Sequence, residues 1–241
     1  MHTVYFMHTH TLSLCSIHRS VVRRALEELF GAGAALGGAF EICSGGRDAE
    51  LWELAAIVSA PGAAAQIMHA DCDGHADGPL LHTAFVALQP VTRSLGPTRF
   101  VPRTHSDPVA YEAVCAKGDV TGLVGGVDVA AGADSVLSYV GILSTGDAQM
   151  YDGRILHCGG PNTDDDATAR AAGATDGLRV QFYTTFRHAD REDAEGNPAA
   201  RSLLTRYSGR VTLGMLRDGR QGGGFDGFFA GDGLSLWEDE P

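Results

Sequence analysis

Residues 52–89, WELAAIVSAPGAAAQIMHADCDGHADGPLLHTAFVALQ, contain three short apolar segments separated by Gly, Pro and Asp. The segments 52–58, 65–71 and 82–89 each have the length of a β-strand, and the breaks between them are typical of turns. Similar short segments follow along the chain, at 98–102, 136–142, 147–157 and 178–186. Several short strands at such intervals predict a mainly β fold, a sandwich or a jelly roll.

Few helices are expected. In residues 18–30, HRSVVRRALEELF, the apolar side chains recur at helical spacing, which predicts a helix packed on the outside of the sheet. A short helix is expected near 109–116, and a further amphipathic stretch lies at 200–207. Residues 158–177 are polar, with an acidic triplet, and are expected to form a surface loop. No linker interrupts the pattern, so the sequence predicts one domain over 1–241.

Composition limits the classes of partner. The formal net charge is -12 and the 18 Lys and Arg residues are scattered, which disfavours nucleic acid because its binding needs clustered basic side chains. The five cysteines lack CxxC spacing, so reduced thiols are expected. No apolar run approaches the roughly 18 residues that span a bilayer, and the N-terminus lacks a signal-peptide pattern. We therefore expect a cytoplasmic protein with a small-molecule substrate; nothing in the sequence predicts an oligomeric state.

The triplet His69-Ala70-Asp71 suggests a metal site. On a strand, residues i and i+2 point to one face, so both side chains can reach one ion. A third ligand must come from elsewhere, and His157 closes the predicted strand 147–157. Two imidazoles and one carboxylate leave three coordination positions open, a set that suits Fe(II). The second HAD triplet supplies rival ligands, His75, Asp73 and Asp77, but the strand-like AQIM before His69 favours the first.

Longer motifs place this triplet in a pattern. AQIMHADCD is followed by TAFVALQPVTRSLGPTRFVPRTH, then by GDAQMYDGRILHCGGPN and RVQFYTTFRH. In order and rough spacing, these segments over residues 52–188 resemble the phytanoyl-CoA dioxygenase family of non-haem iron oxygenases. The resemblance implies a double-stranded β-helix, a cupin-like jelly roll with flanking helices, whose core spans about residues 52–188.

The resemblance also implies roles for individual residues. Fe(II) would be held by His69, Asp71 and His157, and 2-oxoglutarate is the implied co-substrate, with O2 as oxidant. Arg179 matches the arginine that binds the distal carboxylate of 2-oxoglutarate, and Phe85 matches an aromatic residue lining the co-substrate pocket. Arg170 is a competing anchor, but the strand-like RVQFYTTF that begins at Arg179 favours the latter.

Two positions depart from the family pattern. The PGTH-like element reads Pro102-Arg103-Thr104-His105, and an arginine at a left-handed glycine position is strained by roughly 1 kcal/mol or more. Gly159 stands where some members supply a hydroxyl to the co-substrate. These departures keep open a metal-binding or ligand-binding module without turnover.

The expected reaction is hydroxylation of a small, partly apolar metabolite with release of succinate and CO2. Related halogenases replace the carboxylate ligand by a small residue, so the intact Asp71 favours oxygenation. No cluster of Lys and Arg suits the phosphates of coenzyme A, which disfavours a CoA ester as substrate.

Overall fold

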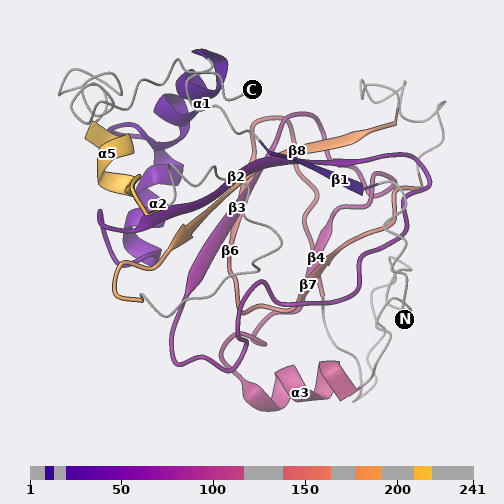
Figure 1. Ribbon diagram of the computed structural model, residues 1–241. Coiled ribbons are helices and arrows are strands. Elements are labelled where there is room, and N and C mark those ends of the chain that lie inside the picture. The colour runs from indigo at the N-terminus through magenta and orange to yellow at the C-terminus, as the bar shows by residue number, and fades with distance from the viewer. Residues whose placement is uncertain (1–8, 14–19, 117–137, 164–176, 192–208, 219–241) are drawn as a thin grey trace, which may run out of the picture.

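The structure is a computed structural model that describes residues 9–13, 20–116, 138–163, 177–191 and 209–218. In these ranges the chain is mostly β, with its strands paired antiparallel in two sheets (Figure 1). The large sheet has the order β1-β2-β8-β3-β6 and the small sheet the order β5-β4-β7. The strands are β1 (Thr9–Ser13), β2 (Glu50–Ser59), β3 (Leu81–Ala87), β4 (Thr98–Phe100), β5 (Tyr139–Val140), β6 (Ala148–Asp152), β7 (His157–Gly159) and β8 (Arg179–Arg187).

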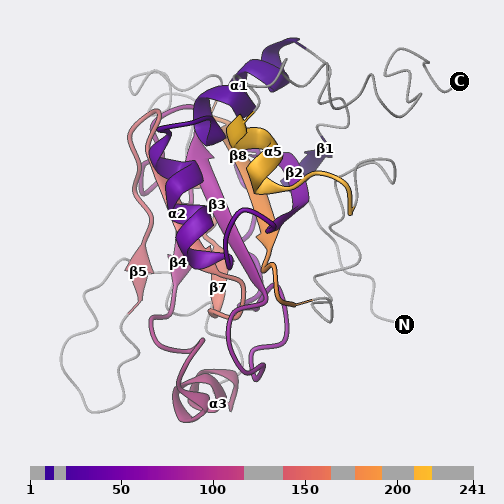
Figure 2. The same ribbon diagram turned by 90° about the vertical axis from the view of Figure 1, so that its left-hand side faces the viewer.

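Helices cover one face of the large sheet. They are α1 (Ser20–Phe30), α2 (Ala35–Cys43) and α5 (Leu213–Asp218), which lie together on its outer side (Figures 1 and 2). Their apolar side chains form one core with the sheet, and its largest members are Leu26, Phe30, Phe40, Leu51, Leu54, Phe182, Phe186, Leu213 and Leu216. This confirms the helix predicted over 18–30, while α2 was not predicted because its ALGGAFEIC sequence carries two glycines.

The inner face of the large sheet turns toward the small sheet. Side chains alternate along a strand, so Phe182 and Phe186 of β8 enter the helical core while Tyr183 between them points inward. Tyr183 packs there with residues of both sheets, namely Ala55, Phe85, Phe100 and Tyr151. One face of the central strands therefore packs in the helical core, and the other face lines the space between the sheets.

Most predicted strands are confirmed, and two predictions were wrong. Residues 65–71 form no strand; within them only His69 pairs, in an isolated bridge to His157. Residues 147–157 form two strands, because Asp152 and Gly153 start a turn that separates β6 from β7. The Asp152 carboxylate accepts hydrogen bonds from the backbone and guanidinium of Arg154, which fixes this turn. Asp-Gly is a turn signal that the apolar pattern obscured.

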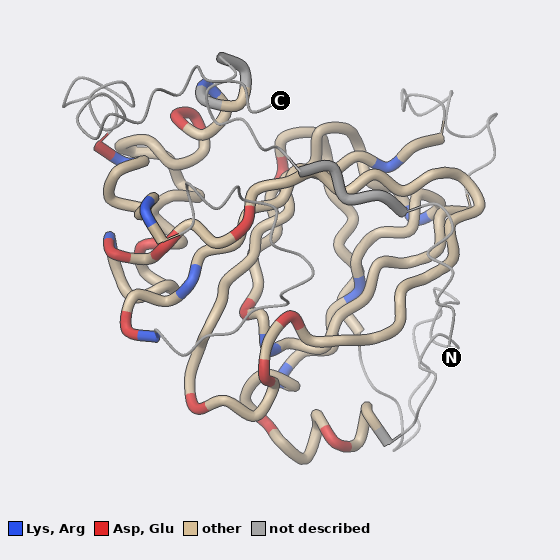
Figure 3. Tube along the Cα trace, viewed as in Figure 1, with Lys and Arg blue, Asp and Glu red and all other residues tan. Residues whose placement is uncertain are grey.

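The last described element is a short helix apart from the helical layer. α3 (Pro108–Ala116) confirms the short helix near 109–116 and lies at one end of the sheets (Figure 1). Residues 200–207 and most of 158–177 lie outside the described ranges. No helix of the described part of the chain is long and apolar enough to cross a membrane. Basic positions are dispersed singly over the described trace, among more numerous acidic ones (Figure 3).

Candidate metal centre

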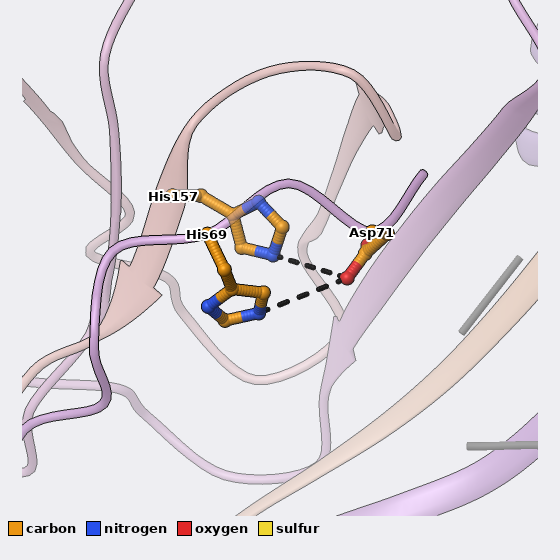
Figure 4. A group of neighbouring side chains, drawn as sticks. All are labelled: His69, Asp71 and His157. Atoms are coloured by element: carbon orange, nitrogen blue, oxygen red, sulfur yellow. Dashed lines mark ion pairs between the residues drawn. The ribbon is translucent and has the colours of Figure 1, made fainter. Parts of the chain in front are cut away.

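His69, Asp71 and His157 come together between the two sheets. Their ligand atoms all lie within 4.8 Å of one another (Figure 4). Asp71 Oδ1 lies 3.8 Å from His69 Nε2 and 3.6 Å from His157 Nε2. His157 is buried, whereas the side chains of His69 and Asp71 are partly exposed. The three residues singled out from the sequence therefore converge, with one side open.

Backbone pairing positions all three residues. His69 and His157 exchange two backbone hydrogen bonds, of 2.9 and 2.8 Å, and the Asp71 N–H donates to the Gly153 carbonyl at 2.8 Å. His157 stands at the start of β7, not at the end of a strand as predicted. The same face is nevertheless reached, because the bridge aligns His69 directly opposite His157.

The two imidazole rings are oriented for Nε2 ligation. Nδ1 of His69 lies 2.8 Å from the Ile67 carbonyl, and Nδ1 of His157 lies 3.0 Å from the Ile155 carbonyl. A carbonyl only accepts, so each Nδ1 carries the proton and each Nε2 keeps its lone pair. Burial lowers the pKa of His157, which favours the neutral ring that a metal needs.

Tyr151 supports the carboxylate and was missed by the sequence reasoning. Its hydroxyl donates to Asp71 Oδ2 at 2.9 Å and lies 3.3 Å from His157 Nε2. Burial, and then the negative charge of Asp71, raise the pKa of Tyr151 well above its usual value, so the phenol keeps its proton. Strand alternation could not have found it, because the turn after Asp152 places Tyr151 and His157 on strands of different sheets.

Arg179 lies in the same cavity, of about 180 Å³, as the three candidate ligands. It is 4% exposed, and its Nε and Nη1 have no hydrogen-bond partner. Burial lowers the pKa of Arg179 to about 10. Buried guanidinium N–H groups without acceptors are costly, and a bound carboxylate would satisfy them. Phe85, 7% exposed, lines the cavity and packs on Tyr151 and Tyr183.

Gln66 explains the glycine at position 159. Its Oε1 accepts a hydrogen bond of 2.7 Å from the Gly159 N–H and lines the cavity. A Cβ at Gly159 would approach this oxygen to 2.8 Å and Arg179 Nη2 to 3.4 Å. A hydroxyl-bearing side chain at position 159 would therefore displace Gln66, a cavity residue that the sequence reasoning missed.

The rival residues lie elsewhere or outside the described ranges. His75 faces Glu112 of α3, with Nε2 at 3.3 Å from the carboxylate, and its ring packs on Tyr111. Asp73 accepts a hydrogen bond from the backbone of His75. None of His75, Asp73 and Asp77 belongs to the cluster, and Arg170 lies outside the described residues.

Arg103 adopts the strained backbone foreseen from the sequence. Its φ is +74°, and no other non-glycine residue of the described ranges has a positive φ. Its guanidinium pairs with Asp107 at 2.8 Å on the surface. The departure at Arg103 therefore affects a turn and is not part of the cavity wall.

Solved structures resemble this fold at low sequence identity. HygX from Streptomyces hygroscopicus, crystallised with nickel and 2-oxoglutarate, matches with a TM-score of 0.50 and 14% identity over 77% of this chain and 72% of its own. The non-haem α-ketoglutarate-dependent epimerase SnoN, from nogalamycin biosynthesis, matches with a TM-score of 0.45 and 20% identity over 68% of this chain and 57% of its own. The carbocyclase SnoK matches with a TM-score of 0.48 and 15% identity over 73% of this chain and 61% of its own. The chain thus spans about three fifths of the length of SnoN and SnoK.

Sequence comparison gives the family directly. A search of curated proteins returned no match. Residues 18–172 match the phytanoyl-CoA dioxygenase (PhyH) family, and this range holds His69, Asp71 and His157 and covers more than half of the chain. The HygX likeness agrees in fold, a jelly roll of two antiparallel sheets that do not close into a barrel. The chain therefore belongs to the phytanoyl-CoA dioxygenase family of iron- and 2-oxoglutarate-dependent oxygenases.

Proposed function

We propose that this protein is an Fe(II)- and 2-oxoglutarate-dependent dioxygenase whose iron is held by His69, Asp71 and His157. The observation that carries the proposal is the convergence of two Nε2 lone pairs and one carboxylate oxygen within 4.8 Å. Residues 1–241 would form one such domain, with the jelly-roll core at about 52–188.

The donor set fits ferrous iron. Two neutral imidazoles and a carboxylate form a facial triad, which leaves positions for a bidentate oxo-acid and for dioxygen. The Nδ1 contacts to the Ile67 and Ile155 carbonyls and the Tyr151 bond to Asp71 are the supporting hydrogen bonds expected around metal ligands. When bound, the ferrous ion supplies the oxidative decarboxylation of 2-oxoglutarate by dioxygen and the oxidation of a substrate C–H bond.

Arg179 fits the distal carboxylate of 2-oxoglutarate. Its two unpartnered N–H groups lie at a cavity wall shared with all three candidate ligands. A guanidinium binds a carboxylate through two parallel hydrogen bonds, which would orient the keto-acid end toward the triad. Phe85 and Tyr183 pack together in the wall between the sheets and give this part of the cavity an apolar surface. The 2-oxoglutarate of the HygX crystal structure supports the same co-substrate here.

The proposed outcome is hydroxylation of a small, partly apolar metabolite, with succinate and CO2 as co-products. Asp71 occupies the carboxylate position, so no coordination site is freed for a halide. The cavity also has apolar walls, among them Ile57, Leu81 and Phe85, suited to a carbon skeleton. The alternative is a module that binds metal or ligand without turnover, but Arg103 lies outside the cavity wall and Gly159 accommodates Gln66, so neither departure from the family pattern requires it.

Two measurements test the proposal. Anaerobic addition of Fe(II) and 2-oxoglutarate to the metal-free protein should give a visible charge-transfer band. In Arg179→Met, a higher concentration of 2-oxoglutarate should be needed to form that band. On exposure to air, the wild-type protein should form succinate only when Fe(II) and 2-oxoglutarate are both present. A protein that binds the ion but neither binds nor consumes 2-oxoglutarate is the binding module instead.

A further inference from the structure

A polar row crosses the inner face of the large sheet. Glu53 of β2 is opposite Thr185 of β8, Thr185 is opposite Thr83 of β3, and Thr83 is opposite Tyr151 of β6. Thr185 Oγ1 donates to Glu53 Oε2 at 2.7 Å, and the two threonine hydroxyls are 2.9 Å apart. At the other end of the row, Tyr151 donates to Asp71. The row thus holds Glu53 at the level of the triad, on the opposite side of the cavity.

Glu53 has no cationic partner in the described part of the chain. Among the described residues, its one hydrogen bond is from Thr185 and it has no ion-pair partner. By contrast, Glu50 on the same strand pairs with Arg187. Burial raises the pKa of Glu53 to about 7, with the hydrogen bond of Thr185 opposing and the charge of Asp71 adding to the rise. A buried carboxyl without a counter-charge tends to take up a proton, and a cationic partner, which the described part of the chain does not supply, would keep it ionised.

The other charges of the cavity balance without Glu53, an argument that rests on the proposed function. The ferrous ion and Arg179 would carry three positive charges. Asp71 and the two carboxylates of 2-oxoglutarate would carry three negative charges. Among the described residues that line the cavity, Glu53 is then the one ionisable side chain without a counter-charge, because both imidazoles are neutral when they bind metal. An occupant with a single positive charge would restore neutrality.

We propose that Glu53 binds a protonated amine of the substrate, which makes the substrate class small molecules with a primary or secondary ammonium group. The Thr185 hydroxyl fixes Oε2 and leaves Oε1 to accept from the ammonium. The apolar side chains of Ile57 and Leu81 line the same cavity and suit the carbon skeleton that carries the amine. Glu53 is a specificity residue in this proposal; it does not touch the metal.

A matched pair of small probes tests the proposal. The protein is loaded with Mn(II) and 2-oxoglutarate, and the affinities of cyclohexylamine and cyclohexanol are measured through the relaxation that Mn(II) induces in their protons. Wild-type protein should bind the amine at least ten times more tightly than the alcohol. Glu53→Gln keeps the shape and the acceptor for Thr185 but removes the charge, so its preference should fall to about one.

Control variants separate this inference from the proposed function. Glu28 is an exposed carboxylate on α1, on the far side of the sheet, and Glu28→Gln should keep the full preference for the amine. Mn(II) and 2-oxoglutarate affinities are measured in the same samples and should be unchanged in Glu53→Gln. Two results would overturn the proposed role of Glu53 and leave the proposed function standing. The first is a wild-type protein that binds Mn(II) and 2-oxoglutarate but does not prefer the amine; the second is a preference for the amine that survives in Glu53→Gln. Failure of the wild type to bind 2-oxoglutarate overturns both proposals.

Discussion

His69 and His157 face each other across an antiparallel bridge, with reciprocal backbone hydrogen bonds of 2.9 and 2.8 Å and ring centroids 4.5 Å apart. The bridge joins the segment after β2 to the first residue of β7, two parts of the chain far apart in sequence. Asp71 is fixed in turn by its own backbone bond to Gly153. Backbone pairing therefore sets the positions of all three candidate ligands.

Asp71→Ala should abolish metal binding without unfolding the protein. The variant loses one ligand and the hydrogen bond of Tyr151, which costs the metal-free protein about 1 kcal/mol. Its backbone bond to Gly153 is retained. Mn(II) titration by calorimetry should show no binding, while urea unfolding in chelator should keep a single cooperative transition. Metal affinity equal to that of the wild type would remove Asp71 from the ligand set.

Arg179→Met should weaken 2-oxoglutarate binding by roughly 30-fold to 1,000-fold, the usual effect of removing one partner of a buried charge pair. The free energy of unfolding without co-substrate should be unchanged or higher, because Nε and Nη1 of Arg179 are buried without acceptors. Calorimetry with Mn(II) present gives the affinity and urea titration gives the stability. Arg93→Met, at an exposed arginine, is the matched control. Unchanged 2-oxoglutarate affinity in Arg179→Met would refute the assignment.

Tyr151→Phe should weaken metal binding by about 10-fold to 100-fold, the usual range for partners that orient metal ligands. Phenylalanine keeps the ring packing against Phe85 and Phe100 but cannot donate to Asp71 Oδ2. Competition with a chelator of known affinity measures the change. Phe85→Leu alters the same aromatic cluster without touching a ligand and should leave metal affinity near the wild-type value. Equal affinities in Tyr151→Phe and wild type would show that the carboxylate needs no such support.

The sequence was most informative where short motifs follow one another in the order that resembles the family. The candidate ligands His69, Asp71 and His157 and the strand that begins at Arg179 were predicted, and the structure brings all four residues to one cavity. The local structure around the ligands was less accessible. Residues 65–71 have the apolar pattern of a strand, but their backbone bonds to Gly153, His157 and Gly159 form only one isolated bridge, at His69, and no continuous ladder.

Residues that act through tertiary contacts were not accessible from the sequence. Gln66 matters because the fold places its Oε1 on the Gly159 N–H, and Glu53 matters because strand register sets it beside Thr185. Neither side chain carries a local signal, since register is decided by pairing partners that are far apart in sequence. Tyr151 belongs with them, because the turn after Asp152 separates its strand from that of His157.

Arg103→Gly should stabilise the protein by about 1 kcal/mol. Arg103 has a φ of +74°, a conformation that costs a side chain with a Cβ roughly that much and costs glycine nothing. The lost ion pair with Asp107 is exposed at the arginine and contributes little. Arg103→Ala is the control, because it removes the same ion pair and keeps the strain. Urea unfolding should give a higher midpoint for Arg103→Gly than for Arg103→Ala; equal midpoints would show that the turn is unstrained.

The stability of the metal-free protein should depend on pH through Glu53. Burial raises the pKa of its carboxyl from 4.5 to about 7, so the folded protein binds this proton more tightly than the unfolded chain. The contribution of Glu53 is therefore fully present below about pH 4.5 and is lost as the pH rises toward 7, by about 3 kcal/mol in total. Glu53→Gln does not titrate. Its free energy of unfolding relative to wild type, measured in chelator, should increase by about that amount from pH 4.5 to 8. A constant difference across this range would mean that Glu53 is solvated like a surface carboxylate, and it would also remove the uncompensated charge on which amine recognition depends.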